Sequence, residues 1–263
     1  MEKQDILQKI VAYKREELLQ QEKMLPLVQL EKQLVDITPC ISMKQALADS
    51  PSGIIAEFKR RSPSKGWINR DADIAVVPEA YEHAGASALS ILTDEHFFGG
   101  SLQDIRIARP RVSLPVLRKD FIINRYQLYQ AKAAGCDAVL LIAAILTSQA
   151  CRKLARQAHD LQLEVLLEIH KETELDYVNE FVDMVGVNNR NLGTFHTDVA
   201  NSFALAELLP KEYLLVSESG ISSPDTVRQL RSVGFRGFLM GETFMKTAAP
   251  AVSLSNFIKQ LTL

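Results

Sequence analysis

The sequence has few cysteines, a single tryptophan and no hydrophobic run long enough to cross a membrane. Its three cysteines, Cys40, Cys136 and Cys151, are odd in number and show no CxxC spacing. A disulfide framework or a structural zinc site is therefore not expected, and a reducing compartment, the cytoplasm, fits best. The longest apolar run, Ala138–Leu146, is about half a membrane span and fits a buried strand. Charge from Glu2 onward argues against a secretory signal.

The sequence also has no large excess of positive or negative charge. The 30 lysines and arginines nearly balance the 32 aspartates and glutamates, which leaves a formal net charge of −2. Nucleic acid and membrane surfaces are therefore not expected as partners. The chain has 263 residues, of which 47% are hydrophobic. This is enough for a large core, and the length is typical of one α/β barrel of about 250 residues.

The first fifty residues differ from the rest. Apolar side chains recur on this charged segment at Ile6, Ile10, Val11, Leu18 and Leu19. They predict an amphipathic helix that ends near Pro26. A second helix is expected over Pro26–Val35 and a short third over Ser42–Leu47. We interpret residues 1–50 as a helical extension packed on the main domain, with a contribution to substrate enclosure as the alternative.

From Gly53 onward a unit of one strand and one helix recurs. The predicted strands are Ile54–Glu57, Ala88–Leu92, Pro115–Arg118, Ala138–Ala143, Glu164–Glu168, Met184–Val187, Tyr213–Ser217 and Gly237–Met240. The predicted helices between and after them are Ala75–Ala84, Leu102–Arg109, Arg125–Ala134, Ser148–Leu161, Glu172–Phe181, Val199–Leu209, Pro224–Val233 and Val252–Leu261. The strands are almost continuously apolar, as parallel strands buried on both faces must be. Eight such units without a linker predict a (β/α)8 barrel, so we expect residues 1–263 to form a single domain.

A barrel of this kind places its chemistry at the carboxyl ends of its strands. The polar and aromatic residues found there are Glu57, Lys59, Lys119, Phe121, Glu168, Asn188, Arg190 and Glu218. Each alone could be a solvated charge where a strand meets its loop. Together they place lysines and glutamates at one mouth, where such groups shift one another's pKa values and become general acids and bases.

The last two strand ends carry an anion-binding pattern. Its residues are Ser219, Gly220, Gly241 and Glu242, with Ser62 from the first loop close enough to join them. The short helical stretch Thr243–Lys246 follows directly. Loops after the seventh and eighth strands, with a short extra helix, form the recurrent phosphate site of barrels. Plain helix-entry turns are the alternative explanation for these glycines.

Other candidates give weaker signals. The five histidines, His83, His96, His159, His170 and His196, show no metal-ligand spacing, and we expect all of them to be structural or surface residues. Phe97–Ser101 after the second strand is either a packed turn that caps the next helix or an apolar wall over a ring-shaped substrate. Trp67 in the first loop is either part of a lid or a surface anchor.

These motifs resemble one family. The stretch Ile55-Ala56-Glu57-Phe58-Lys59-Arg60-Arg61-Ser62-Pro63-Ser64-Lys65-Gly66 resembles the first-strand signature of indole-3-glycerol-phosphate synthases. Similar segments follow in the family's order: Leu92–Asp94, Phe97–Leu102, Arg118–Ile122, Leu163–Glu168, Gly186–Leu192 and Ser217–Ile221. The resemblance covers essentially the whole chain. Two departures are Asn124-Arg125, in place of the more usual Asp-Pro, and Trp67, where a smaller aliphatic residue is common.

The resemblance implies a step of tryptophan biosynthesis. The substrate would be 1-(2-carboxyphenylamino)-1-deoxyribulose 5-phosphate, which closes a ring, loses CO2 and then water, and gives indole-3-glycerol phosphate. No metal and no organic cofactor is implied. Lys119 would be the general acid in ring closure, and Glu168 its partner carboxylate and the base in dehydration. Lys59 would lie near the substrate carboxylate or the departing hydroxyl, and Glu57 would orient it and exchange protons.

The remaining roles follow from the same resemblance. Asn188, counted with the catalytic residues, and Arg190 would hold the substrate and the charge network. Glu218 would bind the substrate, and Phe121 would pack on its anthranilate ring. The phosphate would be bound by Ser62, Ser219, Gly220, Gly241 and the backbone of Glu242. We expect a monomer, with association with other enzymes of the tryptophan pathway as the alternative.

Two other functions compete with this one. A phosphoribosylanthranilate isomerase would need a Cys/Asp acid–base pair, and the position of that cysteine on the first strand carries Glu57 instead. A catalytically silent phosphosugar-binding barrel would keep the phosphate site and lose the acid–base residues, yet Glu57, Lys119 and Glu168 are all present.

Overall fold

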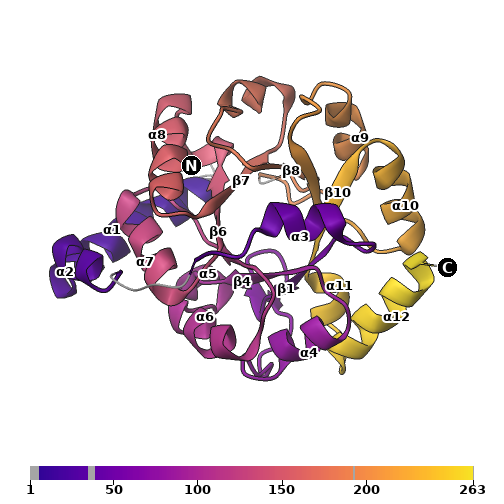
Figure 1. Ribbon diagram of the computed structural model, residues 1–263, viewed down its shortest axis with the longest axis horizontal. Coiled ribbons are helices and arrows are strands. Elements are labelled where there is room, and N and C mark those ends of the chain that lie inside the picture. The colour runs from indigo at the N-terminus through magenta and orange to yellow at the C-terminus, as the bar shows by residue number, and fades with distance from the viewer. Residues whose placement is uncertain (1–5, 35–38, 192, 263) are drawn as a thin grey trace.

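Eight parallel strands form a closed barrel at the centre of the molecule (Figure 1). The computed structural model describes residues 6–34, 39–191 and 193–262, so Val35, at the end of the second predicted helix, lies outside the described residues. The barrel strands are β1 (Ile54–Phe58), β4 (Ala88–Leu92), β5 (Val116–Lys119), β6 (Ala138–Ile142), β7 (Glu164–Ile169), β8 (Met184–Asn188), β9 (Leu214–Glu218) and β10 (Phe235–Met240). Pairing of β10 with β1 closes the ring. The predicted (β/α)8 barrel is confirmed.

Helices surround the barrel. They are α4 (Val77–His83), α6 (Leu102–Ala108), α7 (Arg125–Ala134), α8 (Ser148–Asp160), α9 (Ala200–Ala206), α10 (Pro224–Ser232) and α12 (Pro250–Thr262). Side chains cap the starts of several of them: the Asn124 side chain accepts a bond from the Tyr126 amide, and Ser223 accepts one from the Thr226 amide. Each cap contributes about 1 kcal/mol. Asn124 thus caps α7 despite its departure from the family pattern.

One predicted helix is wrong. The segment Glu172–Phe181 forms only the 3-10 helix η3 (Glu172–Tyr177). Val178 is extended, and the Asn179 side chain accepts a bond from the Phe181 amide. Such local bonds from side chain to backbone compete with helix formation, and a periodicity argument does not include them.

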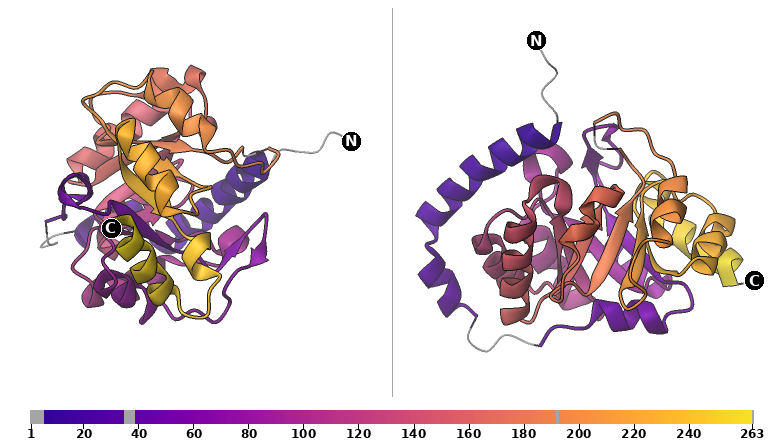
Figure 2. Two further views of the ribbon diagram at one scale, coloured as in Figure 1. Left: turned by 90° about the vertical axis from the view of Figure 1, so that its right-hand side faces the viewer. Right: turned by 90° about the horizontal axis from the view of Figure 1, so that it is seen from above.

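The N-terminal extension wraps the barrel from one end to the other. It contains α1 (Ile6–Met24), α2 (Leu27–Lys32) and α3 (Met43–Asp49). Figure 2 shows α1 along one side of the barrel and α3 beneath the end where the strands begin. The predicted apolar stripe of α1 is partly wrong: the buried residues are Leu7, Ile10, Lys14 and Leu18, whereas Leu19 is 59% exposed.

Side chains on the strands alternate between two apolar layers. One cluster fills the barrel interior with Ile55, Leu117, Leu140, Leu166 and Val216. A second cluster, which includes Ile54, Ala56 and Val139, packs between the strands and the helices. Because successive side chains point to opposite faces, the inward positions recur every second residue. The next inward positions after Ile55, Leu117 and Leu166 are Glu57, Lys119 and Glu168, at the carboxyl end of the barrel.

Several short elements at this end were not predicted. They are the hairpin β2 (Arg61–Ser62) and β3 (Gly66–Trp67), the helix α5 (Glu95–Phe98) and the 3-10 turn η2 (Ala143–Ile145). The short helix α11 (Glu242–Met245) agrees with the predicted helical stretch Thr243–Lys246 to within one residue, and the unpredicted 3-10 turn η1 (Arg109–Arg111) lies at the other end, before β5. Trp67 is 48% exposed, and its ring lies against Gly99, where a Cβ atom would be 3.0 Å away. Ser101 caps α6 through the Gln103 amide, as one interpretation of Phe97–Ser101 predicted.

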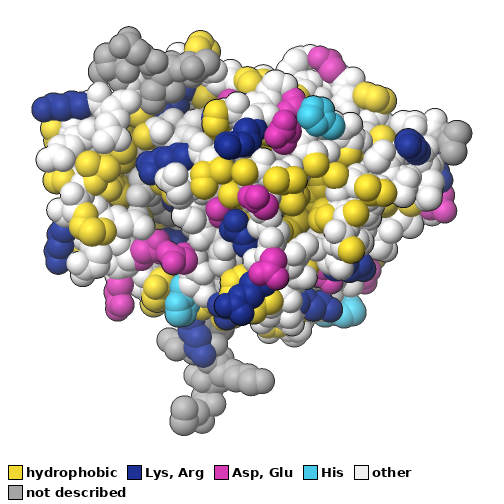
Figure 3. Space-filling view, turned by 90° about the horizontal axis from the view of Figure 1, so that it is seen from below, with side chains coloured by type: hydrophobic (Ala, Val, Ile, Leu, Met, Phe, Trp, Pro, Cys, Tyr) yellow, Lys and Arg dark blue, Asp and Glu magenta, His cyan; other side chains and the backbone are white. Residues whose placement is uncertain are grey.

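The outer surface mixes charges of both signs. Figure 3 shows the side that α4 and α6 cover, where acidic and basic side chains alternate and neither sign gathers into one patch. Among the residues that the structure describes, no helix is long and apolar enough to cross a membrane.

Gly53 offers a test of how the barrel closes. Its φ of +62° and its close approach to β10 both require glycine, since a Cβ atom would lie 2.0 Å from the Arg236 carbonyl oxygen. We expect Gly53→Ala to lower the free energy of unfolding by about 3 kcal/mol in urea denaturation. Gly66 is the matched control, because its φ is +66° and no atom would lie within 4 Å of a Cβ atom added there. Gly66→Ala should cost about 1 kcal/mol, and equal losses would contradict the steric argument.

Candidate active site

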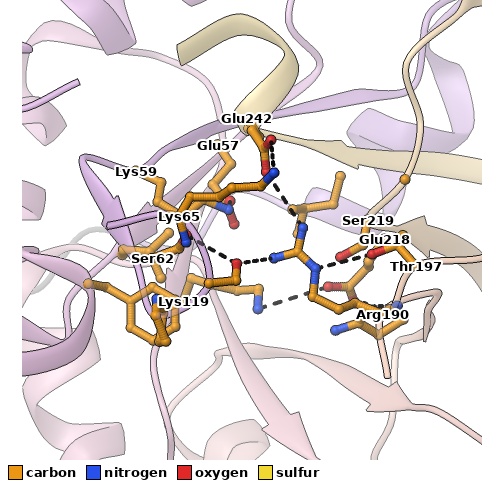
Figure 4. A pocket seen from close by; sticks show the side chains of 18 of the residues that line it. Glu57, Lys59, Ser62, Lys65, Lys119, Arg190, Thr197, Glu218, Ser219 and Glu242 are labelled. Carbon is orange, nitrogen blue, oxygen red and sulfur yellow. Dashed lines mark hydrogen bonds and ion pairs between the residues drawn. The ribbon is translucent and has the colours of Figure 1, made fainter. Parts of the chain in front are cut away.

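All of the predicted site residues line one cavity at the carboxyl end of the barrel. Its volume is about 550 Å³, which is within the range of small-molecule sites. Figure 4 shows Glu57, Lys119, Arg190 and Glu242 pointing into this space. The cavity is therefore built by side chains from every part of the barrel, held at the ends of rigid strands.

Lys119 lies among three carboxylates. Its Nζ atom is 3.3 Å from Glu168 Oε2 and 4.0 Å from Glu218 Oε2. Burial alone would lower the pKa of Lys119, but Glu168, Glu218 and Glu57 together hold it above the ordinary value. Lys119 therefore carries its proton at neutral pH, which is the state that a general acid needs.

Glu168 and Glu218 are neighbouring carboxyl groups whose pKa values shift in opposite directions. Burial raises the pKa of Glu218, and the neighbouring Glu168 raises it further. Burial would raise the pKa of Glu168, but Lys119, His170 and Asn188 together lower it. Two buried carboxylates this close do not both ionise readily. At neutral pH the proton of the pair therefore resides on Glu218, and Glu168 is the ionised member.

Glu57 and Lys59 lie beside one another on β1 and its loop, as their spacing of two predicted. Their side chains form an ion pair, with Lys59 Nζ on Glu57 Oε1. Burial would raise the pKa of Glu57, but Lys59 and Lys119 lower it. Gly241 makes room for this carboxylate, since a Cβ atom there would lie 2.5 Å from Glu57 Oε1. Gly241 thus has a steric role that the phosphate prediction did not include.

Arg190 links the two halves of the cavity. Its guanidinium donates to Ser64 Oγ and Thr197 Oγ1, both at 3.3 Å, and lies 3.6 Å from Glu242 Oε2. Asn188 fixes the base of this side chain, because its Oδ1 atom accepts a 3.0 Å bond from the Arg190 amide. The arginine is thereby aimed across the cavity before any ligand arrives.

The predicted phosphate residues lie on the segments that follow β1, β9 and β10. Ser62 is buried on β2, while Ser219 and Gly220 follow β9 with φ values of +67° and +78°. At Gly220 a Cβ atom would lie 2.7 Å from the Thr197 methyl group, so glycine is required there. Gly241 precedes α11 without a side-chain cap of its own. Backbone amides in such turns are available to an anion.

An apolar wall completes the cavity. The rings of Phe98 on α5 and Phe121 after β5 lie with their centroids 5.8 Å apart, and Leu140 and Ile142 of β6 line the same region. This is the apolar alternative for Phe97–Ser101. Phe121 is buried next to Lys119, so a flat apolar group on the wall would lie within reach of the ammonium.

Sequence comparison agrees with this arrangement. Residues 7–261 match the family model described as indole-3-glycerol phosphate synthase. The chain is 61% identical over 257 residues to an indole-3-glycerol phosphate synthase of Bacteroides thetaiotaomicron, covering 98% of this chain and 99% of the relative. A protein of the same name from Acinetobacter baumannii is 43% identical over 247 residues, covering 93% and 92%.

The chain belongs to the indole-3-glycerol phosphate synthase family.

Solved structures support the fold alone. The tryptophan synthase subunit alpha of Legionella pneumophila superposes with a TM-score of 0.60 at 13% identity, covering 84% of this chain and 96% of that one. The 3-hexulose-6-phosphate synthase of Salmonella typhimurium gives a TM-score of 0.60 at 14% identity, covering 80% and 99%. Both likenesses are to the barrel, at identities too low to argue function.

In this member of the synthase family, the extension reaches the site through one buried lysine. Lys14 of α1 is 1% exposed, and its ammonium lies 2.9 Å from Asp94 Oδ2 and 3.2 Å from Asp120 Oδ1. Asp94 accepts a bond from the Phe97 amide and so caps α5, while Asp120 accepts one from the Phe121 amide. Lys14 therefore neutralises the two carboxylates that hold both sides of the apolar wall.

Sequence reasoning did not identify Ser64 and Thr197, which hold Arg190, or three residues that support the cavity from behind. Gly186 gives Glu218 its space, since a Cβ atom there would lie 2.2 Å from Glu218 Oε1. Lys14 occupies the buried stripe of α1, four positions after Ile10. His170 contacts Glu168 at 3.3 Å, so it is not a surface residue. Spacing relates each of them to a known position without giving its role: Gly186 and His170 lie two residues from Asn188 and Glu168, and Lys14 has helical spacing from Ile10.

Lys14 gives a test of the buried network. We expect Lys14→Met to keep the packing of the stem but leave Asp94 without its cation and Asp120 with Arg118 alone, and so to cost about 3–5 kcal/mol of unfolding free energy. Lys9, exposed on the same helix, is the matched control, and Lys9→Met should change stability by about 0.5 kcal/mol or less. Equal stability of the two variants in urea denaturation would show that the network contributes nothing.

Proposed function

We propose that this chain converts 1-(2-carboxyphenylamino)-1-deoxyribulose 5-phosphate into indole-3-glycerol phosphate, the carboxy-lyase step of tryptophan biosynthesis. Membership of the synthase family gives the reaction. The observation that supports it most directly is a protonated lysine, Lys119, enclosed by Glu168, Glu218 and Glu57 beside an apolar wall. This arrangement offers an acid, carboxylates in two protonation states and a dry surface for an aromatic ring.

Ring closure joins an aromatic carbon of the substrate to its ketose carbonyl carbon. Negative charge then develops on the carbonyl oxygen, and Lys119 donates a proton to it. Phe121 packs on the anthranilate ring and keeps water away from the substrate carboxylate, which favours loss of CO2. The bond between the ring carbon and the carboxyl carbon breaks, carbon dioxide leaves, and the electrons of that bond restore the aromatic ring.

Dehydration needs an acid for the departing hydroxyl and a base for the proton that is lost from the ring. Glu168 is ionised and takes the base role. Lys59, which forms an ion pair with Glu57, takes the acid role. Asn188 and Arg190 orient the substrate, and Glu218 holds a proton beside Lys119.

The phosphate occupies the opposite end of the substrate. We propose that Ser62, Ser219, Gly220, Gly241 and the Glu242 backbone bind it. The left-handed turn at Ser219 and Gly220 and the uncapped start of α11 support this placement. Binding energy from this end holds the reacting ring against Lys119 and the apolar wall.

The neighbouring functions are less well supported. An isomerase of the Cys/Asp type has no cysteine among the described residues that line this cavity, where Glu57 stands instead. A silent phosphosugar-binding barrel would not need Lys119 enclosed by three carboxylates. The deciding experiment is incubation of the purified protein with the carboxyphenylamino-deoxyribulose phosphate. Indole fluorescence and released CO2 are expected. If neither appears while the circular dichroism spectrum shows a folded protein, the chain is a silent barrel.

We further propose one domain over residues 1–263, acting as a monomer in the cytoplasm. The ion pairs of Lys14 join the extension to the barrel and support a single unit. Three free cysteines support a reducing compartment. Sedimentation velocity tests the monomer, and a stable complex with other tryptophan-pathway enzymes would revise it.

Lys119 gives the sharpest test of the mechanism. We expect Lys119→Ala to lower kcat by about 10³-fold or more, because the proton donor for ring closure is lost. Substrate binding through the phosphate end should persist, as measured by fluorescence titration of the inactive variant. Lys44 is exposed at the other end of the barrel, and Lys44→Ala should leave kcat unchanged. Activity close to that of the unmodified protein in Lys119→Ala would remove Lys119 from the mechanism.

A further inference from the structure

His170 lies directly behind Glu168, outside the cavity. It follows β7, two residues after Glu168, and its side chain is 13% exposed. Its Nε2 atom is 3.3 Å from Glu168 Oε1, while the other oxygen of that carboxylate, Oε2, faces Lys119. Glu168 is therefore held between two cations, one on each oxygen, and only Lys119 belongs to the cavity lining.

A second carboxylate faces the other side of the imidazole. Glu174 in η3 is buried, and its Oε2 atom lies 3.6 Å from His170 Nδ1. The same oxygen accepts a 2.7 Å bond from the His170 amide, so Glu174 fixes the backbone and the ring together. Among the described residues, no contact of either ring nitrogen has hydrogen-bond geometry, so Glu168 and Glu174 face the imidazole as ion-pair partners. The charged groups around the ring are Glu168, Glu174 and, beyond them, Lys119 and Lys171.

The backbone at His170 is also braced from α9. Asn201 donates its side-chain amide to the His170 carbonyl at 3.1 Å and to the Asn188 carbonyl at 3.3 Å. This ties the end of β7 to the end of β8. Glu174 of η3 therefore contacts both the ring and the amide of His170, and Asn201 of α9 holds its carbonyl.

We propose that His170 is a positioning residue that keeps Glu168 ionised and turned toward Lys119, and so fixes the shared proton of the carboxylate pair on Glu218. This inference rests on the proposed role of Glu168 as the base. Burial would lower the pKa of His170, but the facing carboxylates of Glu168 and Glu174 raise it to about 9. The ring is therefore an imidazolium at neutral pH, and its charge favours the ionised form of the carboxyl that it contacts.

The consequence for catalysis has a definite sign. A cation beside Glu168 lowers the pKa of that carboxyl, so removal of the cation raises it. Activity requires ionised Glu168, and it is lost as pH falls through this pKa. Loss of His170 should therefore move the acidic limb of the kcat profile to higher pH. The phosphate end of the cavity is untouched, so KM should change little.

The variant His170→Asn tests this directly. We expect kcat to fall about tenfold or more at pH 7, the acidic limb to move up by about 1 to 2 pH units, and KM to stay within about threefold. His159 is the matched control, because it also pairs with a carboxylate, Asp183 at 2.9 Å, but lies on α8 away from the cavity. His159→Asn should leave the profile in place. Superimposable profiles for His170→Asn and the unmodified protein would overturn the proposal.

A readout besides activity comes from the imidazole itself. In protein with 15N-labelled histidine, the His170 signals are those absent from His170→Asn. They should show an imidazolium at pH 7.5, where an ordinary histidine is neutral. Glu174→Gln removes one carboxylate and keeps an acceptor for the His170 amide, so the titration midpoint should fall. A neutral His170 at pH 7.5 would overturn the proposal even if His170→Asn does not fold.

Failure of the proposed function is distinguishable from failure of this inference. Glu168→Gln should abolish turnover if Glu168 is the base. Full activity in that variant would remove the base role, and with it the catalytic importance of His170. An inactive Glu168→Gln with an unshifted His170→Asn profile would instead leave the function standing and overturn only the role of His170.

Discussion

The site depends on one constraint, the balance of buried charge around Lys119. An ammonium enclosed at the end of a barrel is stable only when carboxylates surround it, and those carboxylates are stable only when cations face them. Glu168, Glu218 and Glu57 meet the first need, while Lys119, Lys59 and His170 meet the second. The charges do not simply cancel pair by pair. Lys119 and Glu218 hold protons, whereas Glu168 is ionised. Acid and base are thereby prepared in the same small volume before a substrate binds.

The barrel supplies this arrangement through its period of two. The interior positions that are leucine, isoleucine or valine in one layer become charged in the next layer toward the carboxyl end. The charged side chains in this layer need space, and two glycines provide it: Gly186 lies beside Glu218 and Gly241 beside Glu57. Stability and chemistry therefore occupy successive layers of the same strands. A change of one residue in register would exchange the two sets of side chains between the interior and the helices.

Strand and helix positions, and the residues that line the cavity, could be predicted from the sequence because hydrophobic periodicity and the rule of strand ends act locally. The predictions failed where a local side-chain bond or a distant partner decides the outcome. The segment Glu172–Phe181 has helical spacing, but Val178 and Asn179 end it early. Lys14 is buried because Asp94 and Asp120 lie opposite it. The proposed role of His170 depends in the same way on its contact with Glu168. Assigning either residue required knowing which carboxylate it would meet, which spacing along one element does not give.

The ion pairs of Lys14 also bear on the order in which the chain assembles. Lys14 leaves the ribosome ahead of every strand, yet its two partners follow β4 and β5, and the barrel itself closes only when β10 pairs with β1. Helix α1 therefore cannot bury this charge until the segments after β4 and β5 are in place. Until then α1 is a solvated amphipathic segment, and its docking is a contact between residues far apart in the sequence, which forms more slowly than local structure.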